Sequence, residues 1–313
     1  MHIPVLLNES IEALTGVEAQ PNGVFIDGTF GRGGHSRALL SKLPADAKLI
    51  AFDRDPAAIE AAREINDTRF EIVHAPFSTL GAELAARGVD RIHGALFDLG
   101  VSSPQLDNAE RGFSFMRDGP LDMRMDTTRG ETASQWLARV DETTLSEAIK
   151  NYGEDRFARG IARAIVAARS AWPHNEISTT AELAEIVSKA VRTRERGQHP
   201  ATRTFQAIRI ALNRELDEIT LMLHAATSLL APHARLAVIS FHSLEDRIVK
   251  RCFQALADPE SAMDIVLKKI PIPASQLPVA QFALVGKSAI ASETELSLNP
   301  RARSARLRVL EKL

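Results

Sequence analysis

Residues 24–36 read Val-Phe-Ile-Asp-Gly-Thr-Phe-Gly-Arg-Gly-Gly-His-Ser, and the architecture of the chain follows from this stretch. An apolar strand ends at Asp27, and the glycine-rich turn after it opens into a helix. The next apolar run ends at Asp53. Glycines bring a backbone close to a ligand because no Cβ stands in the way. A carboxylate after the next strand can accept hydrogen bonds from ribose hydroxyls. The pairing predicts a nucleoside-containing cofactor across the edge of a parallel sheet.

The first hundred residues alternate between strand and helix patterns. Apolar runs at 24–27, 48–53, 70–75 and 94–99 predict strands, and helical patterns separate them. Asp55 and Pro56 are typical of a helix start, with Asp as the cap and Pro at the first helical position. Alternation at this spacing predicts right-handed crossovers and a parallel sheet with helices on both faces.

The alternation stops at Gly100. Residues 102–130 have no clean period, and residues 133–193 have a helical period only, with one helix over 155–172 and another after a capping box at 179–182. A long helix over 202–230, a strand over 235–241 and a helix over 243–257 then resume the earlier rhythm. We expect one α/β domain made of residues 1–106 and 199–313, with an inserted all-helical domain at 107–198.

Composition excludes several classes of protein. The chain has 313 residues, 45% of them hydrophobic, and a formal net charge of −2, so a nucleic-acid site must be a local basic patch. The single cysteine, Cys252, excludes an internal disulfide. The histidines lack metal-ligand spacing, so we expect no metal. Because no signal peptide and no long apolar span are evident, we expect a cytoplasmic protein.

Two cofactor classes use such a turn. Dinucleotides prefer G-x-G-x-x-G, whereas the third position here is Ser36. S-adenosylmethionine has a ribose, an adenine and a cationic amino-acid tail but no phosphates. Asp53 suits the ribose, Phe77 suits the adenine face, and Asp98 suits the ammonium group. The pattern favours S-adenosylmethionine, and an NAD-dependent oxidoreductase remains the alternative.

Ser103 and Pro104 follow the fourth strand, where methyltransferases that act on the amino groups of bases often carry a short proline-containing turn. The lone pair of a cytosine N4 is delocalised into its ring. Acceptors that hold the amino hydrogens favour a pyramidal nitrogen, and alignment of nucleophile, methyl group and sulfonium supplies much of the rate. Ser103 and Pro104 are therefore candidate substrate contacts, and no catalytic triad is expected.

Long stretches of the chain resemble the bacterial RsmH (MraW) family. The resemblance rests on the motifs at 27–36, 52–56, 98–107, 111–125, 199–207, 239–247 and 299–304, which span nearly the whole chain. It implies a class I (Rossmann-like) S-adenosylmethionine-dependent methyltransferase domain with an all-helical insert that recognises RNA. The implied substrate is N4 of a cytosine, cytosine 1402 in the family, in 16S ribosomal RNA of the small subunit. Neither DNA nor a membrane is an expected partner, and no oligomeric state is implied.

The resemblance also implies a set of site residues. Carried over position by position, the cofactor-binding residues are Gly33, Gly34, His35, Asp53, Phe77, Asp98 and Gln105. It assigns no catalytic base. A non-catalytic RNA-binding or assembly factor that keeps the cofactor as a structural ligand is the alternative function.

Other segments have two interpretations each. Residues 111–125 interleave basic and aromatic side chains, which suits single-stranded RNA, but a packed domain connection has the same composition. Residues 243–246 match a capping box, so we expect Glu245 and Asp246 to serve a helix start. His242 is either a substrate contact or a structural histidine. Candidate phosphate contacts are Arg203, Arg209, Arg301, Arg303, Arg306 and Arg308.

Overall fold

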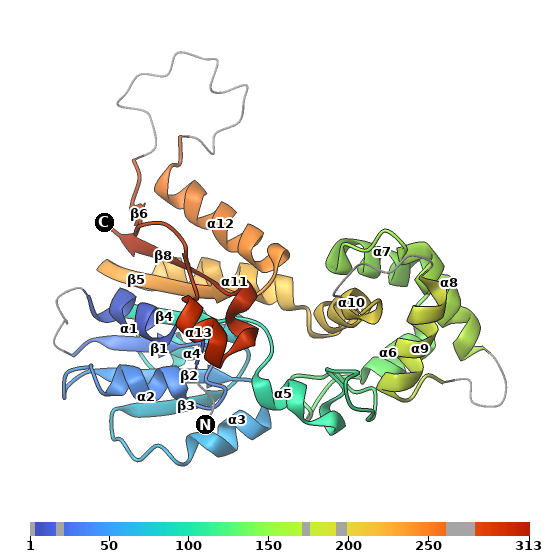
Figure 1. The fold of residues 1–313 in the computed structure, drawn as a ribbon. Helices are drawn as coiled ribbons and strands as arrows, with labels where there is room; N and C mark the ends of the chain where they lie inside the picture. Colours follow the sequence, from blue (N-terminus) through green and yellow to red (C-terminus); the bar gives the residue numbers. More distant parts are fainter. Residues whose placement is uncertain (1–3, 17–21, 171–175, 192–198, 261–278) are drawn as a thin grey trace. The chain divides into compact units, whose positions relative to one another are not determined.

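The computed structural model describes residues 4–16, 22–170, 176–191, 199–260 and 279–313. The chain divides into two compact units, one made of Met1–Gly100 and Leu216–Leu313 and the other of Val101–Glu215 (Figure 1). These boundaries differ from the expected ones at residues 106/107 and 198/199. The difference arises because the short helix after the fourth strand and the helix that begins at Ala201 both pack with the inserted unit.

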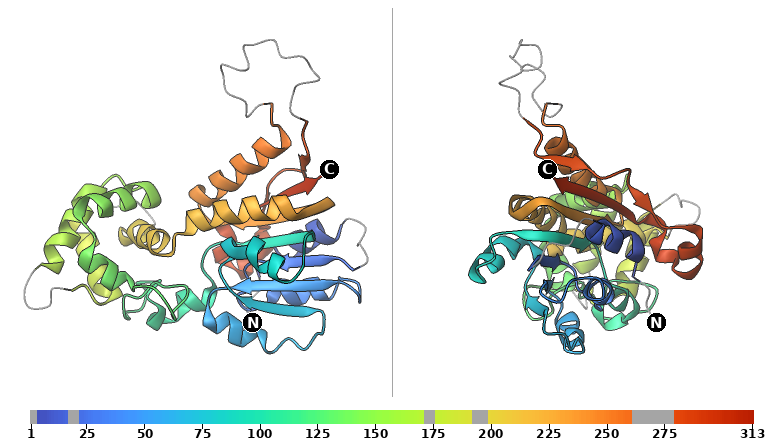
Figure 2. Two further views of the ribbon diagram at one scale, coloured as in Figure 1. Left: turned by 180° about the vertical axis from the view of Figure 1, so that it is seen from behind. Right: turned by 90° about the vertical axis from the view of Figure 1, so that its left-hand side faces the viewer.

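The first unit is built on an eight-stranded sheet in the order β3-β2-β1-β4-β5-β8-β6, with β7 paired to β8. Its parallel part confirms the expected α/β class, and β8 is antiparallel to both β5 and β6. Figure 2 gives two further views of this sheet. The strands are β1 (Val24–Asp27), β2 (Lys48–Asp53), β3 (Phe70–His74), β4 (Ile92–Asp98), β5 (Leu230–Ser240), β6 (Phe282–Leu284), β7 (Ala289–Ile290) and β8 (Arg306–Lys312).

Apolar residues alternate between the two faces of the sheet because successive side chains of a strand point to opposite sides. On one face Phe25 and Leu96 pack with helices α1 (Leu7–Thr15) and α2 (Gly34–Leu40). On the other face Ile26 and Phe97 pack with α4 (Leu80–Ala86), α11 (Glu215–Leu229) and α12 (Ser243–Ala257). Cys252 of α12 is half-buried against this second core.

Local signals place several helix starts as expected. The Asp55 side chain accepts from the Ala57 N–H at 2.9 Å, with Pro56 as the first residue of α3 (Pro56–Ala62). Thr179 and Glu182 form the expected capping box of α9 (Thr180–Ala190). A short α13 (Glu293–Leu298) and the 3₁₀ helix Pro300–Ser304 complete the first unit before β8.

The second unit is helical. Its core gathers side chains such as Leu145, Ile161 and Leu183, all of which are fully buried. The helices are α5 (Ser103–Asp107), α6 (Ala133–Arg139), α7 (Glu142–Gly153), α8 (Ala158–Arg169), α9 and α10 (Ala201–Asn213). The expected helix over 155–172 is thus shorter, although residues 171 and 172 lie outside the described residues.

The single long helix expected over 202–230 is wrong. The structure has two helices, α10 and α11, which are separated at Arg214. Arg214 has a left-handed backbone with φ 51°, which ends a right-handed helix. The apolar period of the sequence continues across this break. Leu212 packs against the core of the second unit, whereas Leu216 packs against the core of the first.

Among the described residues, we find no helix with the length and apolar character needed to cross a bilayer.

Candidate cofactor site

Three carboxylates end three adjacent strands at one edge of the sheet. In the pairing register Asp27 of β1 lies opposite Ala51 of β2 and Leu96 of β4. Asp53 and Asp98 each come two residues later on those strands, so both stand at the carboxyl end of the parallel sheet. Ligands of open α/β sheets bind at this edge, next to the point where the strand order reverses. The reversal here lies between β1 and β4.

The glycine-rich turn after β1 needs glycine at two positions for different reasons. Gly33 has a left-handed backbone with φ 74°, and a Cβ there would lie 2.6 Å from the Phe30 ring. Gly34 does not have a left-handed backbone. A Cβ at Gly34 would overlap the Pro4 ring, so this glycine makes room for another part of the chain. The resemblance could not distinguish these two roles.

Asp53 closes the turn and still has lone pairs for a ligand. Its Oδ2 accepts from the Gly31 N–H at 2.8 Å, and its Oδ1 accepts from the Asp55 N–H at 2.8 Å. A carboxylate offers about four lone-pair positions, so about two remain. Burial raises the pKa of Asp53 to about 6, although the two backbone hydrogen bonds oppose the shift.

Asp98 is a carboxylate in an unfavourable environment. Burial, and then the nearby charges of Asp27 and Glu245, raise its pKa well above the ordinary value of 3.8. Its Oδ1 is buried, and within the described part of the chain no donor bonds to it. Buried acceptors in native proteins are almost always hydrogen-bonded. An unsatisfied anionic oxygen at this edge therefore suits a cationic ligand group.

Asp27 and Thr29 lie at the same sheet edge and form a hydrogen-bonded pair that the sequence analysis did not single out. Asp27 is fully buried, and its carboxylate accepts from the Ser36 hydroxyl at 2.6 Å and from the Thr29 N–H at 3.2 Å. Burial raises its pKa to about 6. The Thr29 hydroxyl oxygen in turn accepts from the Asp98 backbone N–H at 2.6 Å. Thr29 thus joins the ends of β1 and β4.

A Thr29→Val variant should be less stable than the wild-type protein by about 1–2 kcal/mol, because the Asp98 N–H loses its acceptor. Urea unfolding monitored by circular dichroism measures the difference. A Thr29→Ser variant keeps the hydroxyl and should recover most of the loss. If Val and Ser variants unfold at the same urea concentration as the wild type, the hydroxyl does not join the two strands.

His35 opens α2 and is held in one orientation. Its Nε2 lies 3.1 Å from the Val5 carbonyl oxygen. Because a carbonyl only accepts, the Nε2 atom must carry the hydrogen. The other ring nitrogen, Nδ1, lies 3.8 Å from Asp98 Oδ2. The structure therefore brings His35 and Asp98 together, as the resemblance implied for two residues of one site.

Phe77 begins the 3₁₀ turn Phe77–Thr79 after β3 and is half-buried. Its ring packs edge-on against Phe97, with ring centroids 5.9 Å apart and an interplanar angle of 79°. Ser103, Pro104 and Gln105 belong to α5 of the second unit. Gln105 is buried and its side-chain oxygen accepts from the Ser102 N–H at 2.8 Å, so it fixes the start of α5.

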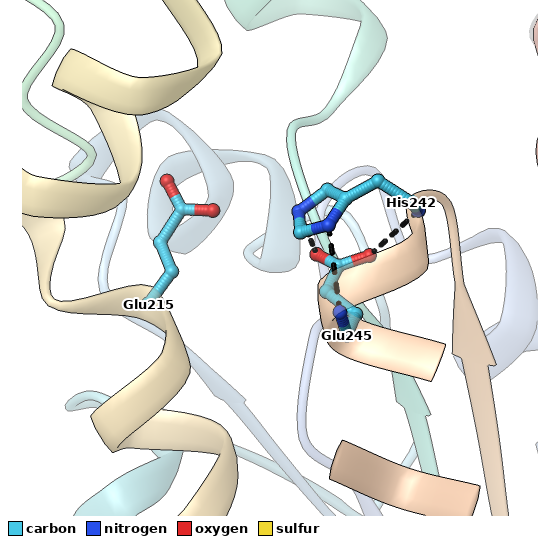
Figure 3. Close-up of side chains that lie close together, drawn as sticks. All are labelled: Glu215, His242 and Glu245. Atoms are coloured by element: carbon cyan, nitrogen blue, oxygen red, sulfur yellow. Dashed lines mark hydrogen bonds and ion pairs between the residues drawn. The ribbon is translucent and has the colours of Figure 1, made fainter. Parts of the chain in front are cut away.

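The start of α12 corrects one expectation. The expected capping box began at Ser243, but the capping residue is His242. Its Nδ1 accepts from the Glu245 N–H at 3.4 Å, and the Glu245 carboxylate accepts from the His242 backbone N–H at 3.2 Å (Figure 3). The same carboxylate also accepts from the Phe241 backbone N–H at 2.8 Å. Glu245 serves the helix start, as expected. A histidine cap is rarer than a serine cap, which is why the pattern pointed one residue too far.

Several arginines that were candidate phosphate contacts bind carboxylates instead. Arg209 makes two hydrogen bonds of 2.8 Å with Glu215. Arg308 pairs with Asp246 at 2.7 and 3.0 Å. These guanidinium groups neutralise charges within their own units, so we do not assign them to RNA. Arg301 and Arg303 are exposed on the 3₁₀ helix before β8.

The residues at the sheet edge fit S-adenosylmethionine. Asp53 has acceptor capacity for a ribose, Asp98 has an anionic oxygen for an ammonium group, and Phe77 offers an aromatic surface. The antiparallel β8 between β5 and β6 completes the sheet that carries them. The fold is that of a class I, Rossmann-like domain, and the residues at its sheet edge suit S-adenosylmethionine.

Comparison with known proteins names the family. A family profile described as the MraW methylase family matches residues 1–313. The chain belongs to the MraW methylase family, which settles the choice between the two cofactor classes in favour of S-adenosylmethionine.

Relatives of similar length carry the name Ribosomal RNA small subunit methyltransferase H. One from Aromatoleum aromaticum (strain DSM 19018 / LMG 30748 / EbN1) is 55% identical over 311 residues, which cover 99% of this chain and 96% of the relative. One from Ralstonia pickettii (strain 12D) is 54% identical over 312 residues, which cover 99% of this chain and 97% of the relative. One from Bordetella pertussis (strain Tohama I / ATCC BAA-589 / NCTC 13251) is 52% identical over 332 aligned positions, which cover 99% of this chain and 89% of the relative.

Proposed function

We propose that this protein transfers a methyl group from S-adenosylmethionine to N4 of a cytosine in 16S ribosomal RNA of the small subunit, at the position corresponding to cytosine 1402. The observation that carries the proposal is similarity over almost the full length to relatives that are named as small-subunit ribosomal RNA methyltransferases. Ser103 and Pro104, which follow the fourth strand, support an amino group of a base as the acceptor. The choice of this cytosine rests on the resemblance to the RsmH (MraW) family.

Each residue of the sheet edge has a proposed task. S-adenosylmethionine, when bound, supplies a methyl group that is activated by a positive sulfur. Asp53 accepts hydrogen bonds from the ribose, and Asp98 holds the ammonium group of the amino-acid tail. Phe77 covers the adenine, and the turn that holds Gly33, Gly34 and His35 lies beside the tail, with Gly34 leaving room for the Pro4 ring. Gln105 orders the turn that carries Ser103 and Pro104.

The reaction needs positioning more than acid-base chemistry. We propose that the Ser103 side chain and a backbone carbonyl next to Pro104 accept the two amino hydrogens of the cytosine, which leaves the nitrogen lone pair directed at the methyl carbon. Methyl transfer would form the N–C bond as the C–S bond of the bound cofactor breaks, and the proton that the nitrogen loses would pass to solvent water. Alignment of this kind supplies a large share of the rate without a strong base.

Isolated small subunits that lack the modification test the proposal. The protein and tritium-labelled S-adenosylmethionine should place label in N4-methylated cytidine after nuclease digestion and chromatography. Subunits in which the target cytosine is replaced by uracil are the matched control and should stay unlabelled. Absence of label in the native subunit would favour the non-catalytic RNA-binding factor. Label in another nucleoside would refute the choice of base.

The inserted unit is the proposed RNA-recognition part, and one of its loops has an exposed apolar tip. The Arg111 guanidinium donates to the carbonyls of Arg124 at 3.0 Å and Met125 at 3.1 Å, which pins the base of the loop. The ring centroids of Phe115 and the exposed His199 lie 4.6 Å apart, and the two ring planes make an angle of 32°. Met116 next to it is 82% exposed. A loop that exposes Met116 beside a half-buried Phe115 and the exposed His199 ring suits contact with unpaired bases.

A Met116→Glu variant should raise the KM for the small subunit about threefold to tenfold, because a carboxylate replaces the apolar contact and repels phosphates. The dissociation constant of S-adenosylmethionine should not change. Filter-binding and methyl-transfer assays measure the two quantities. Leu221→Glu, on an exposed site of the first unit that is 56% accessible, is the matched control and should leave both quantities unchanged. An unchanged KM in Met116→Glu would exclude this loop from the RNA contact.

A further inference from the structure

A short amino-terminal segment crosses the glycine-rich turn. We call residues Pro4–Leu6 the strap. The Pro4 ring occupies the space that a side chain at Gly34 would need, and the Val5 carbonyl accepts from His35 Nε2 at 3.1 Å. Both partners of this hydrogen bond are buried. The strap therefore sets the position of the turn and the orientation of its histidine.

The strap is held in a conformation that its own sequence does not favour. Leu6 has a left-handed backbone with φ 50°, which is uncommon for any residue with a branched side chain. Its side chain is fully buried. Its N–H donates to Glu295 Oε1 at 2.8 Å, from a residue 289 positions later in the chain. Such a conformation persists only where surrounding contacts determine it.

Glu295 would ordinarily serve its own helix. Ser292 caps α13, and its hydroxyl accepts from the Glu295 N–H at 3.1 Å, which is one half of a capping box. In a complete box the glutamate side chain returns to the backbone N–H of the cap residue. In the described structure the Glu295 carboxylate reaches the strap. The Glu295 side chain, which the local sequence would place at its own helix start, thus makes a contact between distant parts of the first unit.

We propose that Glu295 is a positioning residue for the cofactor site and that it acts through the strap on His35. The Glu295 carboxylate accepts from the Leu6 N–H, and the Val5 carbonyl of the same peptide group accepts from His35 Nε2. The other ring nitrogen, His35 Nδ1, lies 3.8 Å from Asp98 Oδ2. Loss of the Glu295 contact releases the strap, and the imidazole beside Asp98 loses its fixed orientation. The inference deepens the proposed function, because it rests on the assignment of His35 to the cofactor tail.

Titration calorimetry of the full chain with S-adenosylmethionine tests the proposal. Glu295→Ala should weaken binding about fivefold to twentyfold, whereas kcat at saturating cofactor should change by less than twofold. Glu295→Gln keeps an acceptor oxygen and should lose no more than threefold. Glu293→Ala, in the exposed first turn of the same helix, is the matched control and should bind like the wild type. Equal binding by the wild type and Glu295→Ala would overturn the proposal.

A double-mutant cycle separates positioning from general loss of structure. In a His35→Ala background, Glu295→Ala should add less than twofold to the dissociation constant, because the residue it positions is already gone. A full additive loss would mean that Glu295 acts on stability alone and would refute the connection. If Glu295→Ala does not fold, the same cycle with Glu295→Ser, whose side chain is too short to reach the Leu6 N–H, decides the question. The binding measurement contains no RNA, so its outcome is independent of the choice of base. If His35→Ala alone binds normally, the proposed role of His35 fails and this inference fails with it.

Discussion

An Asp98→Asn variant should be more stable than the wild-type protein at neutral pH and should bind S-adenosylmethionine at least tenfold more weakly. Burial and the charges of Asp27 and Glu245 raise the pKa of Asp98, so its ionised form is disfavoured in the folded state. A neutral amide avoids that cost. It also removes the charge for the ammonium group, and a hydrogen bond to a charged group contributes about 1.5–3 kcal/mol.

The pH dependence of this stability difference has a definite sign. A carboxyl group whose pKa is raised on folding destabilises the folded state at pH values above its ordinary pKa of 3.8. The difference between Asp98→Asn and the wild type should therefore narrow as the pH is lowered towards 4. Denaturant unfolding over this pH range and calorimetry at pH 7 measure the two effects. A variant that is less stable at pH 7, or that binds normally, would contradict the assignment.

Asp53→Ala should weaken the binding of S-adenosylmethionine by about 1.5–3 kcal/mol, or about tenfold to 150-fold, because the ribose loses its charged acceptor. Part of the loss comes from the turn itself, since Asp53 also accepts from Gly31 and Asp55. Asp53→Asn keeps an acceptor oxygen for only one of these two N–H groups, so its loss combines the charge with one contact of the turn. Normal affinity in both variants would exclude Asp53 from the ribose site.

Cofactor binding by the wild type should weaken below about pH 6. Burial raises the pKa of Asp53 to about 6, and a ribose hydroxyl donates to the ionised carboxylate, so protons compete with the ligand. In Asp53→Asn the slope of affinity against pH should become smaller. Any slope that remains reports Asp98, whose pKa is also raised by burial, together with Asp27, whose pKa burial raises to about 6. Calorimetry at pH 5, 6 and 7 is the measurement.

Short-range chemistry explains which parts of the fold could be predicted. The ends of β1 and β2 and the bounds of α12 coincide with the expected ranges, because apolar runs and caps are local signals. The strand expected at 235–241 begins earlier, at Leu230, and its pairing with β4 is irregular between Ile92 and Gly94. His233 there has φ 64° and follows a proline, which hides the strand signal.

The missed features depend on contacts between distant residues. Nothing near Glu295 indicates that its carboxylate bonds to Leu6 rather than to its own helix. Gly34 reads as a ligand-binding glycine until the Pro4 ring is found against it. The break at Arg214 lies within an unbroken apolar period, so the left-handed backbone there and the separate packing of Leu212 and Leu216 are visible only in the structure. The carboxylates at the strand ends were predictable because parallel strands bring equivalent positions to one edge.

The sheet order also has a consequence for the order in which parts of the protein fold. Strands β1 to β4, with the carboxylates Asp27, Asp53 and Asp98, come from one continuous stretch, residues 24–98. The pairing of β4 with β5 joins Asp98 to Ile239, across the whole helical insert. Loop closure over short separations is faster than over long ones. The half of the sheet that carries the three acids can therefore form first, and the remaining strands add to a template that already exists.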